Sequence, residues 1–285
     1  MITRTATADH PETRRLLMNR PICYFHIGQR PNHEDNFFLN GLYLTPDSQK
    51  QMPQKRSGSI CDTTRTDVRL FAVSDGMGGH NAGEVASRIC VEELASAYSM
   101  LQRTASLQEA VTFLQEVIAQ INEKVCEMSH RRTDLKGMGA TLVLMVTYGT
   151  ELAVLNIGDS RAYQFTDDVM TQITKDHTEG QRMLDLGLLT RKELSTFPAR
   201  KNLSRYIGYG QSGYVLQADE YYPNRKDGIV LLCSDGISDF VPDVRIAEIL
   251  RAEKNLELVG KQLINEAISS QYADNATVIL VPLEE

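Results

Sequence analysis

Acidic side chains stand at the ends of apolar runs in this sequence, where they could bind a cation. An apolar run followed by Ser-Asp-Gly occurs twice, and it places Asp75 and Asp235 at the ends of two predicted strands. Asp159 follows a third apolar run, and Asp274 comes just before a fourth. If these acids converged without basic residues beside them, they would repel one another. Their convergence therefore predicts a metal site.

The types of the donor atoms indicate which metal would bind. Glu34 and Asp35 come directly before another apolar run, with Arg30 five residues ahead of Asp35. All-oxygen ligands are preferred by Mg²⁺ and Mn²⁺. Zinc is disfavoured, because the chain has no His-Glu-x-x-His sequence and no paired spacing of cysteine and histidine. The glycines after Asp75 would let a backbone carbonyl face a metal and would leave room for a phosphate group.

The segment LFAVSDGMGGH, residues 70–80, has two plainer interpretations when it is taken alone. Asp-Gly is a common turn dipeptide, because Asp bonds its own backbone and Gly accepts positive φ. Gly76 to Gly78 also begins a dinucleotide-binding Gly-x-Gly-x-x-Gly, but the sixth position is Asn81, so this motif is incomplete. Only the other acid-bearing segments favour a metal site here.

Composition limits the class of protein. The 285 residues, 42% of them hydrophobic, are enough for one large domain or two small ones. The net charge of −7 disfavours nucleic acid or an anionic membrane as the main partner. We see no apolar N-terminal segment typical of secretion and no membrane span. Five irregularly spaced cysteines predict reduced thiols and a cytoplasmic location.

Hydrophobic periodicity predicts strands in blocks that are separated by pairs of helices. The expected strands are a strand–turn–strand segment at 36–44 and strands at 68–73, 140–148, 151–157, 161–165, 228–234 and 276–282. The expected helices begin at Ala82 and Leu107, lie around 179–187, and span 243–250 and 255–269. Ser106 and Glu109 form a candidate capping box. The short turns Gly-Thr and Gly-Asp-Ser favour antiparallel hairpins between the strands of the second block.

This block order predicts an α+β fold, with antiparallel sheets inside and helices outside. We expect residues 1–21 to be an N-terminal extension and residues 22–285 to be one domain. The polar segment 45–67, with its Pro, Ser and Gly residues, predicts a long loop insert. The segment 176–213 is charged and mixed in pattern.

Eight motifs occur in the order found in the metal-dependent serine/threonine protein phosphatases of type 2C, the PPM family, in its bacterial form. They are RPNHED, SDGMGGHNAGEVAS, GATLVLMV, LNIGDSRAY, KDH, RKNLSRYIG, LLCSDGISDFV and ADNATVILV. The resemblance covers about residues 22–283. It implies a four-layer α-β-β-α sandwich with two Mn²⁺ or Mg²⁺ ions in a cleft at one edge of the sheets.

The resemblance also implies roles for the acids at the metal ions. Asp75 resembles the carboxylate that bridges both ions, and the Gly76 carbonyl would bind one of them. The other ion would be bound by Asp235 and Asp274. Asp35 resembles a direct or water-mediated ligand, with Glu34 holding metal-bound water.

Further roles follow from the same resemblance. Arg30 resembles the phosphate-binding arginine, and its planar guanidinium can hold two phosphate oxygens. Asp159, together with Asp235, resembles the ligands of a third, weaker ion. Residues 176–213 fall where bacterial members carry a mobile flap. Ser160 and Arg161 are interpreted as turn and surface residues.

The chemistry implied is attack on phosphorus by a hydroxide bridging the two ions, without a phosphoenzyme. Some family members carry His two residues after the Asp of the first Ser-Asp-Gly, where this chain has Met77. If that His is a general acid, His80 is the nearest substitute here. His33 and His177 are further candidates, and each could equally be structural.

We therefore expect a monomeric cytoplasmic signalling enzyme that hydrolyses phosphoserine and phosphothreonine in proteins, the products of a serine/threonine kinase. Two alternatives remain open. One is an inactive scaffold that binds phosphoproteins, which the presence of Arg30, Asp75 and the other acids disfavours. The other is a hydrolase of small phosphate esters on the same fold.

Overall fold

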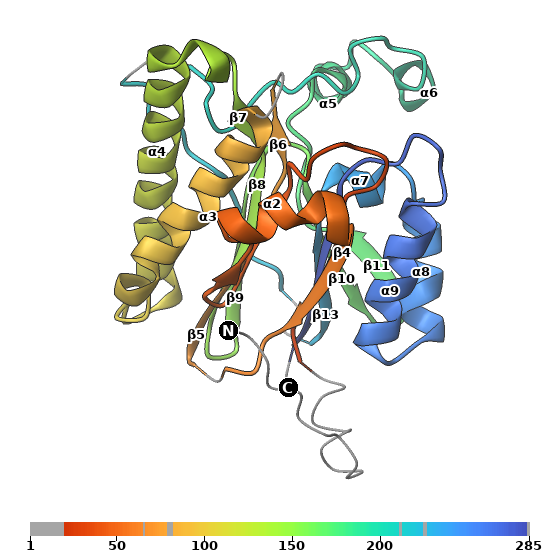
Figure 1. Cartoon of the computed structure of the whole chain (residues 1–285). Coiled ribbons are helices and arrows are strands. Elements are labelled where there is room, and N and C mark those ends of the chain that lie inside the picture. Colours follow the sequence, from red (N-terminus) through yellow and green to blue (C-terminus); the bar gives the residue numbers. More distant parts are fainter. Residues whose placement is uncertain (1–19, 65, 79–81, 211–212, 225–226, 284–285) are drawn as a thin grey trace.

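The computed structural model describes residues 20–64, 66–78, 82–210, 213–224 and 227–283, and these residues form four layers (Figure 1). Two antiparallel sheets of six strands each lie face to face in the middle. A pair of helices covers the outer face of each sheet. The predicted fold class is confirmed.

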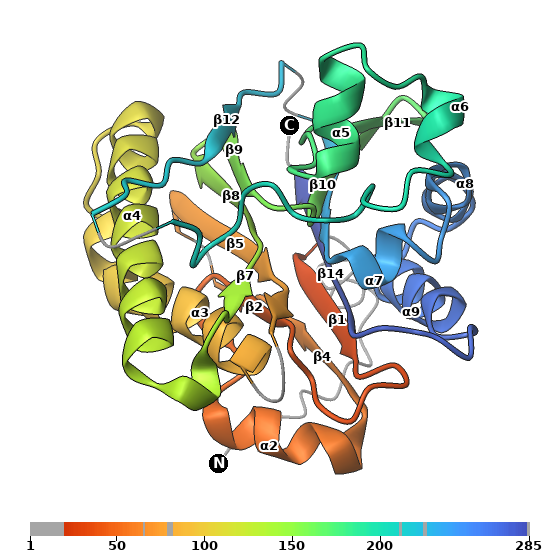
Figure 2. The ribbon, with the colours of Figure 1, turned by 90° about the horizontal axis from the view of Figure 1, so that it is seen from above.

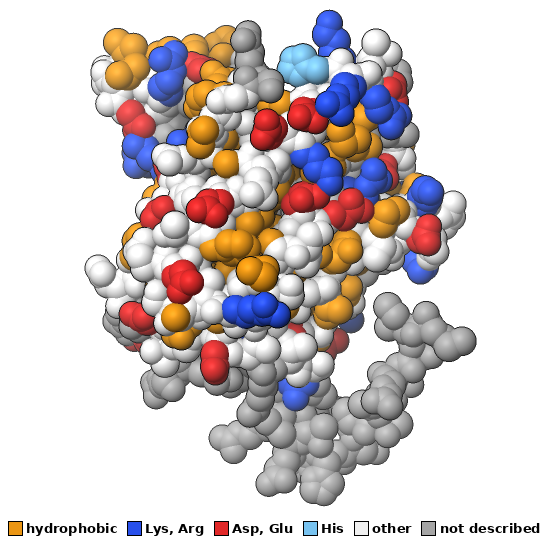
Figure 3. All heavy atoms as spheres, turned by 90° about the vertical axis from the view of Figure 1, so that its left-hand side faces the viewer, with side chains coloured by type: hydrophobic (Ala, Val, Ile, Leu, Met, Phe, Trp, Pro, Cys, Tyr) orange, Lys and Arg blue, Asp and Glu red, His pale blue; other side chains and the backbone are white. Residues whose placement is uncertain are grey.

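The first sheet has the strand order β12-β9-β8-β5-β2-β3, and every pair of neighbours is antiparallel. Its strands are β2 (Asn36–Leu39), β3 (Leu42–Tyr43), β5 (Val68–Ser74), β8 (Leu142–Tyr148), β9 (Glu151–Ile157) and β12 (Asp219–Tyr221). The long helices α3 (Ala82–Leu101) and α4 (Leu107–Arg131) pack on its outer face and bury a large apolar cluster with it. On this side of the molecule, acidic and basic side chains are interspersed among apolar ones (Figure 3).

The second sheet has the order β11-β10-β13-β14-β1-β4, again antiparallel throughout. Its strands are β1 (Ile22–His26), β4 (Ser57–Cys61), β10 (Arg161–Thr166), β11 (Val169–Gln172), β13 (Gly228–Cys233) and β14 (Ala276–Leu283). The helices α8 (Asp243–Ala252) and α9 (Leu256–Ala267) cover its outer face.

Strand β14 shows why the central strands read as continuous apolar runs. Its side chains alternate between the two faces of the sheet. Val278 and Leu280 join the cluster under α8 and α9, whereas Ile279 and Val281 join the core between the two sheets. Because both faces of such a strand are covered, apolar residues fill most of it, and its one polar residue, Thr277, is hydrogen-bonded to Asp35.

Helix boundaries in the first half of the chain follow the sequence closely. α3 begins at Ala82 as expected. The Ser106 hydroxyl caps α4 by accepting a hydrogen bond from the Glu109 N–H at 3.2 Å. The Glu109 carboxylate accepts from the N–H of Ala105, one residue before the cap, at 2.8 Å. The capping prediction is thus confirmed, with its second bond shifted by one residue.

The prediction of a loop over 45–67 is wrong. Residues 46–55 form helix α2 (Pro46–Lys55), which lies across one edge of the sandwich (Figure 2), and β4 follows it. The helix forms because Thr45 caps it and Pro46 suits its first turn, where no backbone donor is needed. Met52 fixes the helix to the body by entering the core between the sheets.

The predicted hairpin across Gly-Asp-Ser is also wrong, although the hairpin across Gly-Thr, between β8 and β9, is confirmed. β9 belongs to the first sheet and β10 to the second, so the chain crosses between the sheets at residues 158–160. Gly158 permits the crossing with a φ of +103°, and a Cβ there would lie 2.6 Å from Thr141 Cγ2.

Short elements complete the part of the chain that the structure describes. They are β6 (Gly76–Met77), β7 (Gly139–Ala140), the 3₁₀ turn η1 (Thr133–Leu135), α5 (Glu179–Asp185), α6 (Arg191–Leu194) and α7 (Asp235–Ser238). None of the described helices combines the length and apolar character needed to cross a bilayer. The predicted N-terminal extension lies almost wholly outside the described residues.

Candidate metal centre

The five predicted aspartates lie at strand ends contributed by both sheets. Asp35 precedes β2 and Asp75 follows β5, both in the first sheet. Asp235 follows β13 and Asp274 precedes β14, both in the second sheet. Asp159 stands where the chain crosses between the sheets. The carboxyl groups of Asp35 and Asp235 both lie within hydrogen-bonding reach of the Asp75 carboxyl.

Burial and mutual proximity raise the pKa values of several acids in this cluster. Burial raises the pKa of Asp75 well above its ordinary value, and the charges of Asp35, Asp235 and Asp159 raise it further. Burial also raises the pKa of Asp235 to about 7 and that of Asp159 to about 8, with neighbouring acids adding to both. A cluster with such pKa values cannot hold all its negative charges at neutral pH without a positive partner.

Asp35 tests whether these residues fit a cation. Its side chain is fully buried, and its Oδ2 accepts hydrogen bonds from Ser234 Oγ and Thr277 Oγ1, each at 2.7 Å. Its Oδ1 is buried and has no hydrogen-bond partner among the described residues. An unpartnered carboxylate oxygen beside several other acids fits a divalent ion with oxygen ligands.

The side chains are not arranged as a finished coordination shell. Within the described residues, no three His, Cys, Asp or Glu side chains are placed so that they could hold one metal ion together. The carboxylates of Asp75, Asp159 and Asp235 are partly exposed, so a cation can reach them from solvent. The individual ligand assignments therefore stay predictions.

The backbones of Glu34 and Gly76 are in close contact. The Gly76 N–H donates to the Glu34 carbonyl at 3.2 Å, and the Glu34 N–H donates to Asn275 Oδ1 at 2.7 Å. A Cβ at Gly76 would lie 2.0 Å from the Gly83 carbonyl oxygen, so only glycine fits there. Burial raises the pKa of the Glu34 carboxyl to about 7, an effect that Arg30 partly offsets.

Arg30 is paired with one of the predicted ligands. Its Nη2 lies 2.5 Å from Asp274 Oδ2, and this bond raises the pKa of the arginine. The Arg30 side chain is 55% exposed, so it stands at the rim of the acid cluster. A guanidinium has five N–H donors, and those not used by Asp274 can reach a ligand from solvent.

The three histidine candidates have different outcomes. His80 lies outside the described residues. His33 is buried, with its Nδ1 2.9 Å from the Asp35 carbonyl oxygen, and burial lowers its pKa to about 4. It is therefore neutral at physiological pH. The buried ring of His177 accepts from the Gly158 N–H at 3.0 Å and contacts Asp219 at 3.1 Å. His177 thus helps to fix residues 158–160, where the chain crosses between the sheets at Asp159.

Thr141 and Ser160 are site residues that the acid pattern did not reveal. The Asp75 N–H donates to Thr141 Oγ1 at 3.0 Å, and the Thr141 N–H donates to the Asp75 carbonyl at 2.8 Å. The Thr141 and Ser160 hydroxyls are 2.6 Å apart, and both side chains are buried. Ser160 is therefore a buried link between the turns that carry Asp75 and Asp159.

The interpretation of Arg161 as a surface residue is wrong. Its side chain is only 23% exposed, and it binds Asp176 with Nε at 2.9 Å and Nη2 at 2.6 Å. Its Nη1 also donates to the Tyr163 hydroxyl at 3.0 Å, which in turn donates to Asp243 Oδ1. A bidentate pair of this kind fixes the residues that follow Asp159.

The predicted flap, 176–213, contains α5 and α6 and lies above α7 (Figure 1). At one end, Ile207 exchanges two backbone hydrogen bonds with Ala140, of 2.8 and 3.0 Å. The ammonium group of Lys201 is paired with Asp239, which follows α7 directly. The flap is therefore linked to the same short helix that begins with Asp235.

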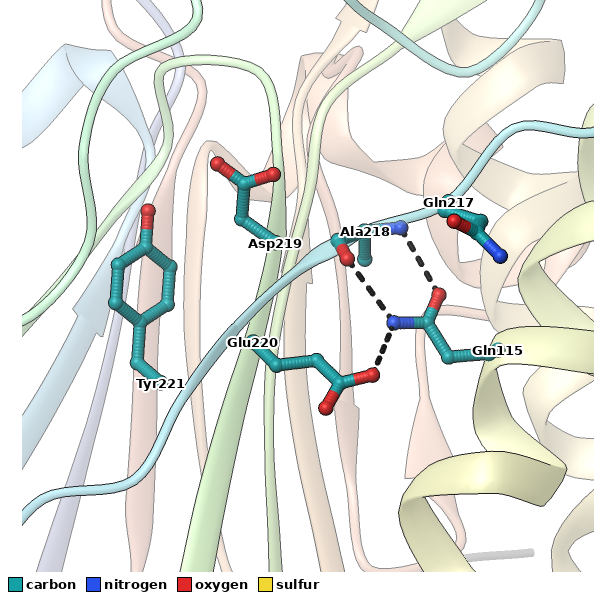
Figure 4. A pocket seen from close by; sticks show the side chains of 6 residues that line it. All are labelled: Gln115, Gln217, Ala218, Asp219, Glu220 and Tyr221. Atoms are coloured by element: carbon teal, nitrogen blue, oxygen red, sulfur yellow. Dashed lines mark hydrogen bonds between the residues drawn. The ribbon is translucent and has the colours of Figure 1, made fainter.

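A pocket of about 480 Å³ is lined by Gln115 of α4 and by residues 217–221, which include β12 (Figure 4). The Gln115 side chain bonds both backbone groups of Ala218 there, at 2.9 and 3.0 Å, and it also bonds Glu220. The Gln115 side chain thus satisfies the backbone donor and acceptor of Ala218, as a neighbouring strand would do at this edge of the first sheet. None of the predicted site residues lines the pocket.

Comparison with known proteins identifies the family. A family model described as protein phosphatase 2C matches residues 56–264. The chain belongs to this family. A serine/threonine phosphatase stp of Listeria innocua is 34% identical over 212 residues, covering 74% of this chain and 83% of the relative. The serine/threonine protein phosphatase PstP of Mycobacterium tuberculosis is 35% identical over 77% of this chain, which spans 41% of that relative.

Solved structures of phosphatase 2C relatives agree with the fold. The Mycobacterium tuberculosis phosphatase PstP/Ppp matches with a TM-score of 0.72 and 30% identity, covering 93% of this chain and 100% of that one. The catalytic domain of PstP in complex with two manganese ions matches with a TM-score of 0.69 and 29% identity, over the same shares. The predicted family and enzyme class are confirmed.

Proposed function

We propose that this phosphatase 2C domain hydrolyses phosphoserine and phosphothreonine in proteins, with divalent metal ions bound by its acid cluster. One observation carries the proposal: buried and half-buried carboxylates from both sheets share a site with raised pKa values, and the exposed Arg30 stands beside them. The names of the relatives, serine/threonine phosphatases, support the type of substrate.

Manganese is the metal we propose first, because a related catalytic domain is described in complex with two manganese ions. Magnesium has the same preference for oxygen ligands, and we propose it as the alternative. We propose that Asp75 would bridge the two ions, that the Gly76 carbonyl would bind one of them, and that Asp235 and Asp274 would bind the other. Asp35 would be a direct or water-mediated ligand, and Glu34 would hold a metal-bound water. Asp159 would bind a weaker third ion together with Asp235.

Bound divalent ions would supply positive charge for the phosphate and lower the pKa of an attacking water. The chain's own residues position the reactants. Arg30 presents its free guanidinium N–H groups to the phosphate oxygens from the rim of the site. The backbone of Glu34 is held by Asn275, which directly precedes β14, and by Gly76 of β6, so its carboxylate can orient a water.

Glycines leave room for the phosphate beside this water. Gly78 has a φ of +147°, and a Cβ there would lie 3.0 Å from the Cβ of Ala82 and 3.3 Å from the Cα of Met138. The proton for the leaving oxygen must come from a group other than His33, since burial keeps that ring neutral. We keep His80 as the proposed donor.

Turnover of a phosphothreonine peptide by metal-stripped protein tests the proposal. We expect activity to appear on addition of Mn²⁺ and to disappear with excess chelator. Asp235→Asn should lower the rate by about 10²-fold or more at fixed Mn²⁺, because a ligand charge is lost. Asp134→Asn, which changes an exposed acid paired with Arg132, should keep wild-type activity.

The same assay separates the alternatives. A scaffold would bind the phosphopeptide without releasing phosphate under any metal condition. A small-molecule hydrolase would cleave p-nitrophenyl phosphate but not phosphopeptides. Full phosphopeptide turnover in excess chelator would contradict the metal-dependent mechanism itself.

We further propose that the substrates are products of a serine/threonine kinase, that the enzyme acts in signalling in the cytoplasm, and that it is a monomer. All five cysteines are free and four are buried, which fits a reducing compartment.

A further inference from the structure

Three tyrosines form a row on the surface close to the acid cluster. The rings of Tyr206 and Tyr209 meet edge to face with centroids 5.4 Å apart, and those of Tyr209 and Tyr214 do so at 6.0 Å. Tyr209 is 41% exposed and Tyr214 is 48% exposed. We call Tyr206, Tyr209 and Tyr214 the tyrosine row.

The row is joined to the strand that leaves Asp75. Gly76 and Met77 pair with β7, and Ala140 of β7 exchanges two hydrogen bonds with Ile207. Tyr206 therefore belongs to a backbone that is two hydrogen-bonded steps from Gly76. Its ring and the Met77 side chain both border Gly139, because a Cβ at Gly139 would lie 2.7 Å from Tyr206 Cδ2 and 2.8 Å from Met77 Cε.

The backbone that carries the row is held rigidly by α4. Asn122 accepts from the Gly208 N–H at 2.7 Å, and its amide nitrogen donates to the Tyr209 carbonyl at 3.4 Å. Gly208 and Gly210 have φ values of +94° and +97°, which side chains rarely tolerate. Residues 208–210 are therefore held in a specific turn, and the ring of Tyr209 is exposed to solvent.

Rigid, exposed aromatic rings are suited to binding. A tyrosine offers a large contact area and loses little conformational entropy when it binds, because it has only two side-chain torsions. The first ring of the row and Met77 both border Gly139, so a polypeptide that brings a phosphate to the Asp75 cluster has the row next to its path. Ring spacings of 5.4 and 6.0 Å each match about two residues of extended chain, at about 3.3 Å per residue.

We propose that the tyrosine row binds an apolar side chain of the phosphoprotein substrate, a few residues from the phosphorylated residue. The inference rests on the proposed function, since it assigns a specificity determinant to the same site. Of the occupants that an apolar surface could have, the substrate is favoured because the backbone next to Tyr206 is hydrogen-bonded through β7 to the strand that follows Asp75.

Matched peptides test the proposal. The probes are phosphothreonine peptides that carry Phe or Ser at each position up to five residues on either side, together with p-nitrophenyl phosphate. We expect wild-type protein with Mn²⁺ to prefer Phe over Ser at one or two positions. Tyr209→Ala and Tyr214→Ala should each lower kcat/KM for the preferred peptide by about 5- to 20-fold, mainly through KM. Turnover of p-nitrophenyl phosphate should stay unchanged.

Two controls separate binding by the rings from general damage. Tyr209→Phe keeps the ring and should keep the preference for the Phe peptide. Tyr222→Ala removes a tyrosine of similar exposure, 46%, that follows β12, and it should change neither substrate. Fluorescence anisotropy of the same peptides in chelator measures the preference without turnover, so a failure of the proposed catalysis does not hide the result.

Three results would overturn the inference. Wild-type protein could show no preference between Phe and Ser peptides in either turnover or anisotropy. The alanine variants could lose activity on p-nitrophenyl phosphate as strongly as on peptides, which would make the row structural. Sedimentation could show that Tyr209→Ala converts a dimer to a monomer while the peptide preference survives, which would assign the row to a second copy of the chain.

Discussion

Replacing Asp75 by Asn should make the metal-free protein more stable and at the same time remove most of the stabilisation that Mn²⁺ provides. Burial raises the pKa of Asp75 well above its ordinary value, and the charges of Asp35 and Asp235 raise it further, so ionising Asp75 in the metal-free protein costs stability. An amide of the same shape removes the Asp75 charge and leaves the surrounding packing unchanged. Metal-free stability and metal response should therefore change in opposite directions.

Asp235, a buried acid of the same cluster whose pKa is about 7, sets the scale of this cost. The usual value is about 3.9, so the difference of about three pKa units corresponds to about 4 kcal/mol of destabilisation once the group is ionised. Burial is the largest cause of this shift, so we assign about 1–2 kcal/mol to neighbouring charge. Because the folded state binds the proton more tightly, this cost grows as the pH rises from about 4 to 7 and is complete at pH 8.

Thermal unfolding at pH 5 and pH 8, with chelator or Mn²⁺, measures both effects. In chelator at pH 8, we expect Asp75→Asn to raise Tm by about 2–8 °C, at about 2–4 °C per kcal/mol in a domain of this size. The gain should be smaller at pH 5. For wild-type protein, Mn²⁺ at 100 times its Kd at pH 8 should add about 2.7 kcal/mol. The same concentration should add less at pH 5, where protons compete for the carboxylates, and the gain should be mostly absent in the variant.

The reasoning is refuted if Asp75→Asn lowers Tm in chelator at pH 8. It is also refuted if Mn²⁺ stabilises the variant as much as the wild type. Asp134→Asn provides the control, because it changes an exposed acid far from the cluster in sequence and should leave both measurements unchanged.

Three further predictions concern residues around the cluster. Arg30→Ala should raise the activation free energy that corresponds to kcat/KM for phosphopeptides by about 2–4 kcal/mol. The Mn²⁺ activation curve should not move to higher concentration, because the variant also frees Asp274. A curve that moved to higher concentration with KM unchanged would contradict this role. Gly78→Val should abolish turnover in a folded protein, as circular dichroism can verify, since valine is strained at a φ of +147°; wild-type turnover would disprove it. Lys201→Ala should free the flap from α7 and speed cleavage within 176–213 in limited trypsin digests, and Asp239→Asn should do the same. Equal cleavage rates in the wild type and both variants would show that the pair does not hold the flap.

Periodicity was sufficient to predict the long elements of the fold. The apolar stripes of α3 and α4 predict helices, because one face of each helix must be covered. The apolar runs of the central strands predict strands, because both faces of each strand must be covered. α2 escaped prediction because it has only ten residues, contains Pro53 and buries just Gln49 and Met52. Its stability comes from its contact with the core between the sheets and not from its own pattern.

Short connections were the second source of error. Gly-Thr between β8 and β9 makes a hairpin, whereas Gly-Asp-Ser, of similar length, carries the chain from one sheet to the other. The difference lies in tertiary hydrogen bonds, which the sequence of a turn does not indicate. The Gly158 N–H donates to the His177 ring, and the Ser160 hydroxyl bonds to the Thr141 hydroxyl. Both partners come from other parts of the chain.

The gathering of the acids could be predicted, because strand ends of a sandwich meet at its edges. The pairing of Arg30 with Asp274 could not, since their positions are far apart in sequence and either could have faced another partner. The burial of Arg161 was missed for a similar reason: its partner Asp176 comes after β11 has turned the chain back.

The distribution of the acids along the chain also has a consequence for how the protein folds. The hydrogen bond between Glu34 and Asn275 joins residues 241 positions apart, and β14 inserts between β13 and β1. Contacts of such long range form late, because closing a long loop costs entropy before the contact rewards it. The repulsive charges therefore come together only after the apolar layers are in place. A chain emerging from the ribosome carries its acids dispersed and captures metal only when its last described strand has been added.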